Sequence, residues 1–202
     1  MFGEATTVCW KCGRPARSLV ARDKQDQVRC HTCDEHAYSA ARACGVYEAA
    51  LRAVVLALKR EPYLPEHLVQ LLGTAARRPP LDRTSVIIPV PLHPAREKAR
   101  GFNQAALIAS AVSKCVGVPM NEVSVERVTH SEKYRAGLDA KGRQETVANA
   151  FTVVHQKLIN KEEVLLVDDV FTTGATVSAC ADVLLAAGAS RVFVLTIART
   201  VR

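Results

Sequence analysis

The sequence predicts an α/β protein in which a parallel sheet is flanked by helices and preceded by a small cysteine-rich module. Short apolar runs rich in β-branched residues alternate with longer segments whose apolar residues recur at helical spacing. Such alternation is typical of parallel strands joined by helical crossovers, so both faces of the sheet should be covered. Two features add detail: a pair of aspartates directly after one buried run, and two closely spaced cysteine pairs near the N-terminus.

The composition is that of an ordinary globular protein. The chain has 202 residues, of which 49% are hydrophobic and 23% charged, and this excludes a disordered or low-complexity chain. No apolar stretch approaches the roughly 18 residues that indicate a membrane span. The first residues lack the basic start and apolar run of a secretory signal. We therefore expect a soluble, cytoplasmic protein.

The positive charge of the chain is concentrated in its middle. Lys and Arg exceed Asp and Glu by 27 to 20, and residues 41–120 hold 11 of these basic and 5 of these acidic residues, a net +6 of the total +7. A localised basic excess favours a polyanionic partner, either a phosphorylated metabolite or a nucleic acid. A solvated basic face is the alternative explanation.

Four of the seven cysteines form two CxxC pairs separated by 17 residues: Cys9, Cys12, Cys30 and Cys33. This spacing is typical of a zinc ribbon, because each CxxC turn supplies two thiolates to one tetrahedral Zn²⁺. Four thiolates leave no open position, so the metal should be structural, and His31 inside the second pair should be exposed. Two redox-active pairs are the alternative. The remaining cysteines, Cys44, Cys115 and Cys180, lie in apolar surroundings and should be buried.

We place a module boundary after residue 37, since residues 1–37 contain too few large apolar residues to fold without a metal. Residues 38–47 lead from this module into a domain that spans residues 38–202. The first half of that domain is expected to contain, in order, helices at 48–59 and 65–77, a buried strand at 85–91 and a helix at 103–116.

The second half begins with a strand at 122–127 and a polar, charged loop at 128–142. The expected elements that follow are a short helix at 143–149, strands at 151–154 and 164–168, a helix at 175–187 and a last strand at 191–198.

The segment 164–177, VLLVDDVFTTGATV, carries the candidate site. Its buried strand ends in Asp168 and Asp169, and the turn that follows contains Thr172, Thr173, Gly174, Ala175 and Thr176. A loop that enters a helix presents free N–H groups and the positive end of the helix dipole, which suits a phosphate. Carboxylates accept hydrogen bonds from vicinal hydroxyls, such as those of a ribose. The pattern therefore indicates a sugar phosphate, whereas the alternative is a capped helix behind two solvent-facing acids.

A second polar cluster follows the strand at 85–91. Arg100, Asn103 and Gln104 either contact a ligand or, in the case of the two amides, begin the next helix as caps. His93 stands next to a proline and is expected to be structural.

These segments resemble known families. The VLLVDDVFTTGAT segment is similar to the phosphoribosyl pyrophosphate (PRPP) motif of type I phosphoribosyltransferases. The double CxxC, the IPVPLH segment at 88–93 and the RGFNQ segment at 100–104 resemble the ComF family, which is associated with DNA uptake in natural competence. The resemblance covers nearly the whole chain.

The resemblance implies a type I phosphoribosyltransferase-like sheet, with Asp168 and Asp169 on the ribose hydroxyls, the loop 172–176 around the 5′-phosphate and Mg²⁺ at the pyrophosphate. It also implies a pyrophosphate loop formed by Val90, Pro91, Leu92 and His93. Residues 128–142 look like a lid, whose cations near the leaving pyrophosphate would come from Lys133, Arg135, Lys141 and Arg143. Arg143 joins the two aspartates as a candidate catalytic residue, and Arg100 and Asn103 as family-specific ligand contacts.

Three functions fit these observations. The chain could be an enzyme that replaces the pyrophosphate of PRPP by a nitrogen nucleophile, with Mg²⁺. It could instead be a non-catalytic PRPP or nucleotide sensor that acts with proteins of the competence machinery. The third is a single-stranded nucleic-acid-binding protein that uses the zinc module and the basic region 41–120, although an aromatic content of 5% offers few stacking platforms.

Overall fold

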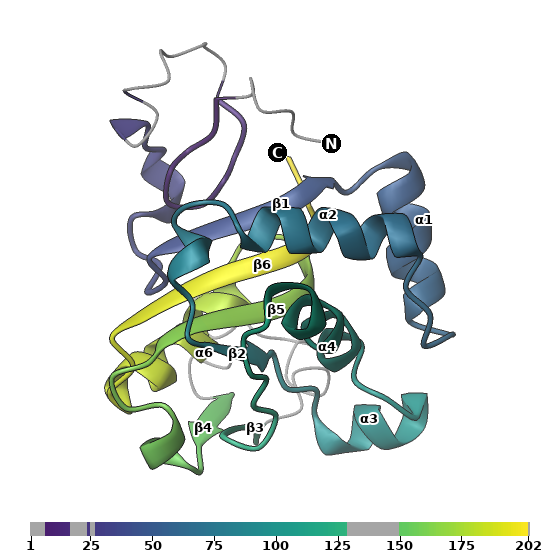
Figure 1. Ribbon diagram of the computed structural model, residues 1–202, viewed down its shortest axis with the longest axis vertical. Coiled ribbons are helices and arrows are strands. Elements are labelled where there is room, and N and C mark those ends of the chain that lie inside the picture. Colours follow the sequence, from purple (N-terminus) through teal and green to yellow (C-terminus); the bar gives the residue numbers. More distant parts are fainter. Residues whose placement is uncertain (1–6, 17–23, 25–26, 129–149, 202) are drawn as a thin grey trace, which may run out of the picture.

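A computed structural model describes residues 7–16, 24, 27–128 and 150–201. Its centre is a four-stranded, wholly parallel sheet in the order β1-β6-β5-β2 (Figure 1). The strands are β1 (Ala40–Val46), β2 (Val86–Pro89), β5 (Glu163–Phe171) and β6 (Arg191–Arg199). The parallel α/β class predicted from the sequence is confirmed.

Three helices cover one face of the sheet: α1 (Ala49–Leu58), α2 (Glu66–Ala76) and α4 (Gln104–Val116). Figure 1 shows α2 and α4 in front of the strands. Leu165, Phe193 and Leu195 of the two central strands pack there with Leu72 and Ile108 of the helices, all at most 1% exposed. Burying side chains of this size contributes about 1.5–3 kcal/mol each, so this face anchors the domain.

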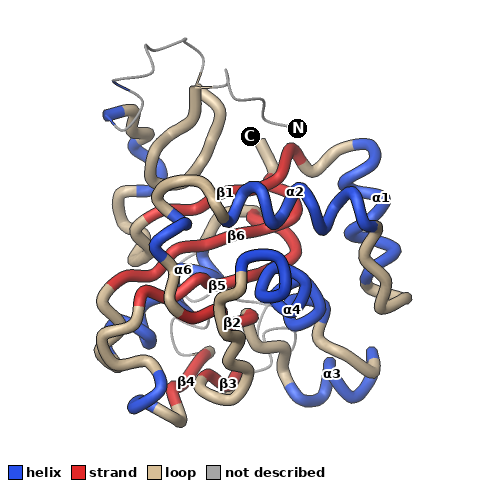
Figure 2. Tube along the Cα trace, in the orientation of Figure 1, coloured by secondary structure: helices blue, strands red, loops and turns tan. Residues whose placement is uncertain are grey.

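The other face has a less regular cover. Helix α6 (Ala175–Ala186) packs on it, beside an antiparallel pair formed by β3 (Val125–Arg127) and β4 (Phe151–Val153). Figure 2 shows this pair apart from the main sheet. The cysteine-bearing segment belongs to the same core cluster, in which Cys9, Cys12 and Cys33 pack with sheet residues such as Ala41.

The parallel register brings three strand ends to one edge. Phe171 of β5 is paired with Arg199 of β6, and Arg199 in turn with Val46 of β1. The short strand β2 ends earlier, because its last residue, Pro89, is paired with Val167. Loops that leave this edge are therefore neighbours in space, which is where ligands of open α/β sheets bind.

Most predicted elements are present, with three differences. Residues 38–47, expected only to connect the modules, contain the edge strand β1. The polar cluster after β2 includes an additional helix, α3 (Pro94–Arg100). Strand β5 continues through both aspartates to Phe171. The predicted helix 143–149 and the part of the loop from 129 onward lie outside the described residues.

Shorter features complete the chain. Single 3₁₀ turns occur at His31–Cys33, Leu81–Arg83 and Gln156–Leu158. Cys44 and Cys180 are buried as predicted, whereas Cys115, which lies on α4 beside Gly73 of α2, is only half-buried. Among the described helices, none has the length and apolar character needed to cross a bilayer.

Candidate functional site

The two aspartates are the sixth and seventh of the nine residues of β5, and their side chains lie on different sides of the sheet. Successive side chains of a strand point to opposite faces. Asp168 lies on the α6 side, where the Arg127 charge acts on it, and its Oδ1 accepts the Asp169 N–H at 2.8 Å. Burial, followed by the neighbouring Asp169 carboxylate, raises the pKa of Asp168 to about 8. Asp168 is therefore largely protonated at neutral pH until a cation or a ligand compensates its charge.

Asp169 lies on the opposite side, within a chain of polar contacts. Its Oδ2 is 3.7 Å from Lys59 Nζ, at the end of α1, and accepts a hydrogen bond from Gln104 Nε2 at 3.3 Å. Arg100 donates to the Oε1 of the same glutamine. The RGFNQ segment is thus joined to the acid pair across 65 residues. Sequence reasoning missed Lys59, because nothing local links the end of a helix to a distant strand.

Asn103 and the segment 90–93 lie next to this polar chain of contacts, at the end of β2. Asn103 Oδ1 caps α4 by accepting the Ala105 N–H at 3.0 Å, while its Nδ2 donates to the Val90 carbonyl at 3.2 Å. Its amide thus begins the helix and also holds the predicted pyrophosphate loop against it. His93 caps α3, since its Nδ1 accepts the Ala95 N–H at 3.1 Å, as expected of a structural histidine.

Pro91 and Leu92 of the predicted pyrophosphate loop line a pocket of about 310 Å³. The opposite side of this pocket is formed by β3 and the loop before it, including Glu122, Glu126 and Arg127. The pocket is open and polar, and it lies next to the end of β2. The segments around 90–93, 100–104 and 168–169, which the sequence implicated, therefore lie together at the carboxyl edge of the sheet.

The loop 172–174 connects β5 to α6. Gly174 has φ +88° and is the N-cap of the helix, while Thr173 Oγ1 accepts the Ala175 N–H at 3.3 Å. A Cβ at Gly174 would stand 2.7 Å from the Phe171 ring and 3.0 Å from His36 Nε2. The position therefore requires glycine both for its φ and for its close neighbours. Thr172 and Thr173 are exposed, and Ala175 and Thr176 lie in the first turn of α6, whose amides suit an anion.

The two CxxC pairs come together as a compact cluster. The four Sγ atoms all lie within 4.8 Å of one another, with Cys9 to Cys33 at 3.7 Å and Cys12 to Cys30 at 3.5 Å. Four sulfurs at 2.3 Å from a tetrahedral Zn²⁺ would be about 3.8 Å apart, so one ion fits the cluster. Burial raises the pKa of the Cys12 thiol, and a cation bound at the cluster would favour its thiolate. His31 is exposed, as predicted.

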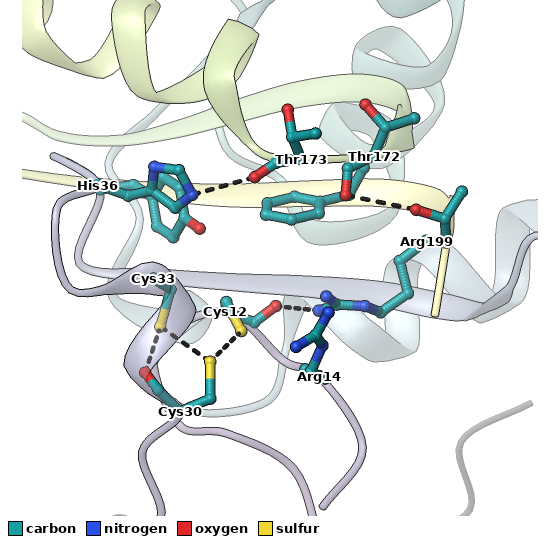
Figure 3. Close-up of a pocket in the computed structure, with 11 residues that line it drawn as sticks. Cys12, Arg14, Cys30, Cys33, His36, Thr172, Thr173 and Arg199 are labelled. Carbon is teal, nitrogen blue, oxygen red and sulfur yellow. Dashed lines mark hydrogen bonds between the residues drawn. The ribbon is translucent and has the colours of Figure 1, made fainter. Parts of the chain in front are cut away.

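The cysteine cluster and the loop 172–174 face each other across a pocket of about 270 Å³ (Figure 3). Its walls include Cys12, Cys30, Cys33, Thr172 and Thr173, and also Phe171 of the 164–177 segment. Three further wall residues, His36, Tyr38 and Arg199, were not singled out by sequence reasoning. No sequence signal marks these three, because they meet only in the fold.

The candidate lid falls in a part of the chain that is not described. Lys133, Arg135, Lys141 and Arg143 lie within 129–149, outside the described residues. Their roles at the pyrophosphate remain predictions.

An acid pair near the end of a central parallel strand, followed by a Thr–Gly loop into a helix, defines a type I phosphoribosyltransferase-like fold. DNA utilization protein YhgH of Escherichia coli K12 is 30% identical over 202 residues, which cover 96% of this chain and 85% of that protein. The chain belongs to the family of these proteins, the ComF family.

Other relatives align over shorter stretches. Competence protein F of Haemophilus influenzae is 37% identical over 126 residues, 62% of this chain and 55% of that protein, so the match spans about half of it. Competence protein ComFC of Bacillus subtilis is 28% identical over 107 residues, 53% of this chain and 41% of that protein. No family model matches the chain.

Similar solved structures include two proteins whose names refer to PRPP or to purines. A glutamine PRPP amidotransferase from B. subtilis aligns with a TM-score of 0.43 at 17% identity, over 64% of this chain and 25% of that chain. A purine phosphoribosyltransferase from Pyrococcus horikoshii aligns with a TM-score of 0.41 at 15% identity, over 67% and 82%. The fold class rests on the sheet order and the family rather than on these alignments.

Proposed function

We propose that this chain binds PRPP or a nucleotide at the carboxyl edge of β5, with Mg²⁺. The observation that carries the proposal is the order of groups along one strand and its exit. Asp168 and Asp169 stand on β5, the exposed threonines follow, and the amides of the first turn of α6 come next. Carboxylates that accept ribose hydroxyls would thus lie one loop away from donors for a 5′-phosphate.

The remaining residues support the same ligand. The segment 90–93, fastened by Asn103, would face the pyrophosphate. Asp168 and Asp169 offer the oxygen ligands that Mg²⁺ prefers, alone or through its waters. When bound, Mg²⁺ would neutralise charge on the pyrophosphate. Lys59 and Gln104 hold Asp169 in one orientation, which lowers the entropy lost when a ribose binds.

We further propose that the bound PRPP is a substrate. In this reaction the C1–oxygen bond to pyrophosphate breaks, a C1–nitrogen bond to the acceptor forms, and the acceptor loses one proton to solvent. Catalysis would consist of positioning and charge stabilisation, with Arg143 and the lid cations Lys133 and Arg135 near the leaving group. A sensor that binds PRPP without turnover is the alternative.

The test combines binding with pyrophosphate release. Mg·PRPP and a panel of nucleotides are titrated into the full chain, and Asp169→Asn should weaken binding about ten- to a hundredfold, because a charge-assisted hydrogen bond is lost. Asp82→Asn, at an exposed position in the Leu81–Arg83 turn, is the matched control and should bind normally. Pyrophosphate release with a nitrogenous acceptor identifies an enzyme, and tight binding without release identifies a sensor. If the wild type binds neither PRPP nor any nucleotide, the proposal is wrong.

We propose that the four-cysteine cluster holds one structural Zn²⁺. The support is the sulfur spacing and the burial of Cys9, Cys12 and Cys33. Zinc would complete a module at residues 1–37, next to a phosphoribosyltransferase-like domain at 38–202. Metal analysis of protein purified without chelator should find one zinc per chain.

A role in DNA uptake is also proposed, because relatives carry the names competence protein and DNA utilization protein. The net +6 of residues 41–120 would favour single-stranded DNA or acidic partner proteins of the competence machinery. DNA affinity should then fall with salt by a slope of about 0.7 per phosphate contacted. Charge reversal at the exposed Arg60 and Lys114 should flatten this slope. Absence of binding at low salt would remove direct DNA contact.

A further inference from the structure

The cysteine cluster and the phosphate loop share more than a pocket wall, because the residues that follow Cys33 contact the loop directly. His36 Nε2 is 3.0 Å from the Thr173 carbonyl oxygen, and the Ala37 N–H donates to Ser178 Oγ of α6 at 3.0 Å (Figure 3 shows the first contact). The backbone of His36 is itself held by the cluster, since the His36 backbone N–H donates to the Cys33 carbonyl at 3.2 Å. A continuous path of hydrogen bonds therefore leads from a cysteine ligand to the loop.

We propose that His36 is a positioning residue through which metal at the four cysteines orders the phosphate loop, so that metal and phosphate ligands strengthen each other's binding. The proposal deepens the proposed function: the part that concerns the phosphate ligand rests on it, whereas the effect of the metal on the loop does not. By thermodynamic linkage the effect is reciprocal: if metal raises the affinity for the phosphate ligand by some factor, the ligand raises metal affinity equally.

The geometry of the peptide group explains what the His36 contact does. A carbonyl only accepts, so Nε2 carries the proton and donates to Thr173. The Thr173–Gly174 peptide is planar and trans, so its C=O and N–H point in opposite directions. Fixing the carbonyl toward His36 therefore turns the Gly174 N–H away from it, as an oriented donor at the entrance to α6. Without His36, this peptide loses the hydrogen bond that fixes its carbonyl, and the donor is less pre-organised.

A second path runs through the pocket walls. Arg199 donates to the Cys12 carbonyl and lies over the Phe171 ring, with 5.0 Å from Cζ to the ring centroid. Tyr38 packs edge-on against the same ring, with centroids 6.0 Å apart. Phe171 directly precedes the loop, and Thr200 Oγ1 donates to the Thr172 carbonyl at 3.3 Å. Phe171 and Thr172, where the loop begins, thus both contact residues that line the pocket with the cysteines.

Two of these residues carry buried polar atoms that have no hydrogen-bond partner among the described residues, Tyr38 Oη–H and Arg199 Nε–H. Tyr38 is fully buried and Arg199 is 4% exposed, and both line the pocket with Cys12, Cys30 and Cys33. Leaving a buried donor unpaired costs about 1–3 kcal/mol. Thiolates held by a metal are acceptors for such donors, as outer partners of a metal site usually are. Both donors therefore belong to residues that share the pocket with the cysteine sulfurs, and a metal-loaded cluster would add acceptors to that pocket.

Hydrogen exchange of the full chain tests the proposal without a ligand. Exchange of residues 171–178 is compared between zinc-loaded and chelator-treated protein. In the wild type, chelation should accelerate exchange in 171–178. In zinc-loaded His36→Ala, exchange of residues 171–178 should already be faster than in the zinc-loaded wild type. Chelation should accelerate it less than in the wild type. His36→Gln keeps a side-chain N–H donor and should restore protection. His67→Ala, at an exposed histidine on α2, should behave as the wild type.

The ligand arm measures the dissociation constants for Mg·PRPP and a mononucleotide in loaded protein. His36→Ala should weaken binding about three- to tenfold, the value of one hydrogen bond, and His36→Gln much less. If loaded wild type binds no such ligand, the proposed function fails, while the exchange result still decides the coupling.

Three results would overturn the coupling. One is chelation that changes exchange near the cysteines but not at 171–178. Another is His36→Ala with wild-type exchange in the loaded state. The third is a cluster that takes up no zinc. If chelation unfolds the chain, seen as rapid exchange in the buried strand 86–89, the coupling is decided by comparing loaded His36→Ala and His36→Gln with the loaded wild type.

Discussion

The candidate site has two sides that are held in different ways. On the helix side, Asp169 is held by Lys59 at the end of α1 and Gln104 at the start of α4, two helices that pack on a continuous apolar face. On the cysteine side, the loop 172–174 is held by His36, which follows a cluster of four thiols. The first side depends on ordinary hydrophobic packing, whereas the second depends on a cysteine-rich segment, for which we propose a metal, with little apolar surface of its own. The two sides should therefore respond to different perturbations.

The largest expected effect is on the cysteine side. Cys9→Ser or Cys30→Ser should abolish stoichiometric zinc, because structural zinc binding contributes roughly 10–16 kcal/mol in zinc-finger peptides. The Tm should fall by more than about 10 °C, with exchange increasing around the cysteines while α1, α2 and α4 stay protected. Cys115→Ser, at a half-buried cysteine outside the cluster, is the control. Variants that retain one zinc per chain would contradict this prediction.

Next in size is a glycine comparison on the same side. Gly174→Ala and Gly117→Ala both place a Cβ on a residue with positive φ, which costs about 1–2 kcal/mol. At Gly117 the Cβ meets no atom of the described part of the chain within 4 Å, whereas at Gly174 it meets Phe171 and His36. Gly174→Ala should therefore lose about 1–3 kcal/mol more stability in denaturant titration. Equal losses would show that the contacts at Gly174 relax without cost.

The third prediction concerns pH and Asp168, between the two sides. Its pKa is raised to about 8 from the ordinary value of 3.8, so the folded state binds this proton more tightly than the unfolded state. Stability from this group therefore falls as pH rises from about 4 to about 8. Asp168→Asn removes the loss of unfolding free energy that comes from ionising this buried carboxyl. Its Tm should match that of the wild type near pH 4 and exceed it above pH 8.

A Tm difference that stays constant between pH 4 and 9 would contradict the raised pKa. The same variant should lose affinity for a ribose phosphate, so stability and binding should change in opposite directions.

The smallest effect is expected on the helix side. Lys59→Ala should cost about 0.2–1 kcal/mol of unfolding free energy, because the lysine is 39% exposed in its pair with Asp169. The loss should shrink at high salt and should be the same with and without zinc. Arg60→Ala, an exposed neighbour, is the control. A zinc-dependent loss at Lys59 would show that the two sides are not independent.

The order of elements and the position of the acid pair were predictable from the sequence, because the strand patterns at 164–168 and 191–198 are strong. Strand β1 was not predictable. Its sequence, AARACGV, has few β-branched residues, and it is a strand because it pairs with β6. Helix α3 is short and polar, and its boundaries come from the His93 cap and Gly101 at φ +86°.

The contacts that organise the site were beyond sequence reasoning for a related reason. Lys59 and Asp169 are far apart in the chain, as are His36 and Thr173, and no periodicity reports such pairs. The RGFNQ and CxxC motifs marked the neighbourhood, but the connecting residues Lys59, His36, Tyr38 and Arg199 carry no motif.

The strand order has a consequence for synthesis on the ribosome. Strand β6 lies between β1 and β5, and Ala40 of β1 is paired with Phe193 of β6. Strand β1 therefore has no neighbour in the sheet until β6 has been made. The cysteine pairs emerge before β1 and are available to zinc during that interval, whereas the contact between His36 and Thr173 waits for β6 to fix β1 in the sheet. Metal loading would thus precede completion of the site, and a chain short of zinc would reach its final folding step with an unanchored edge exposed to aggregation.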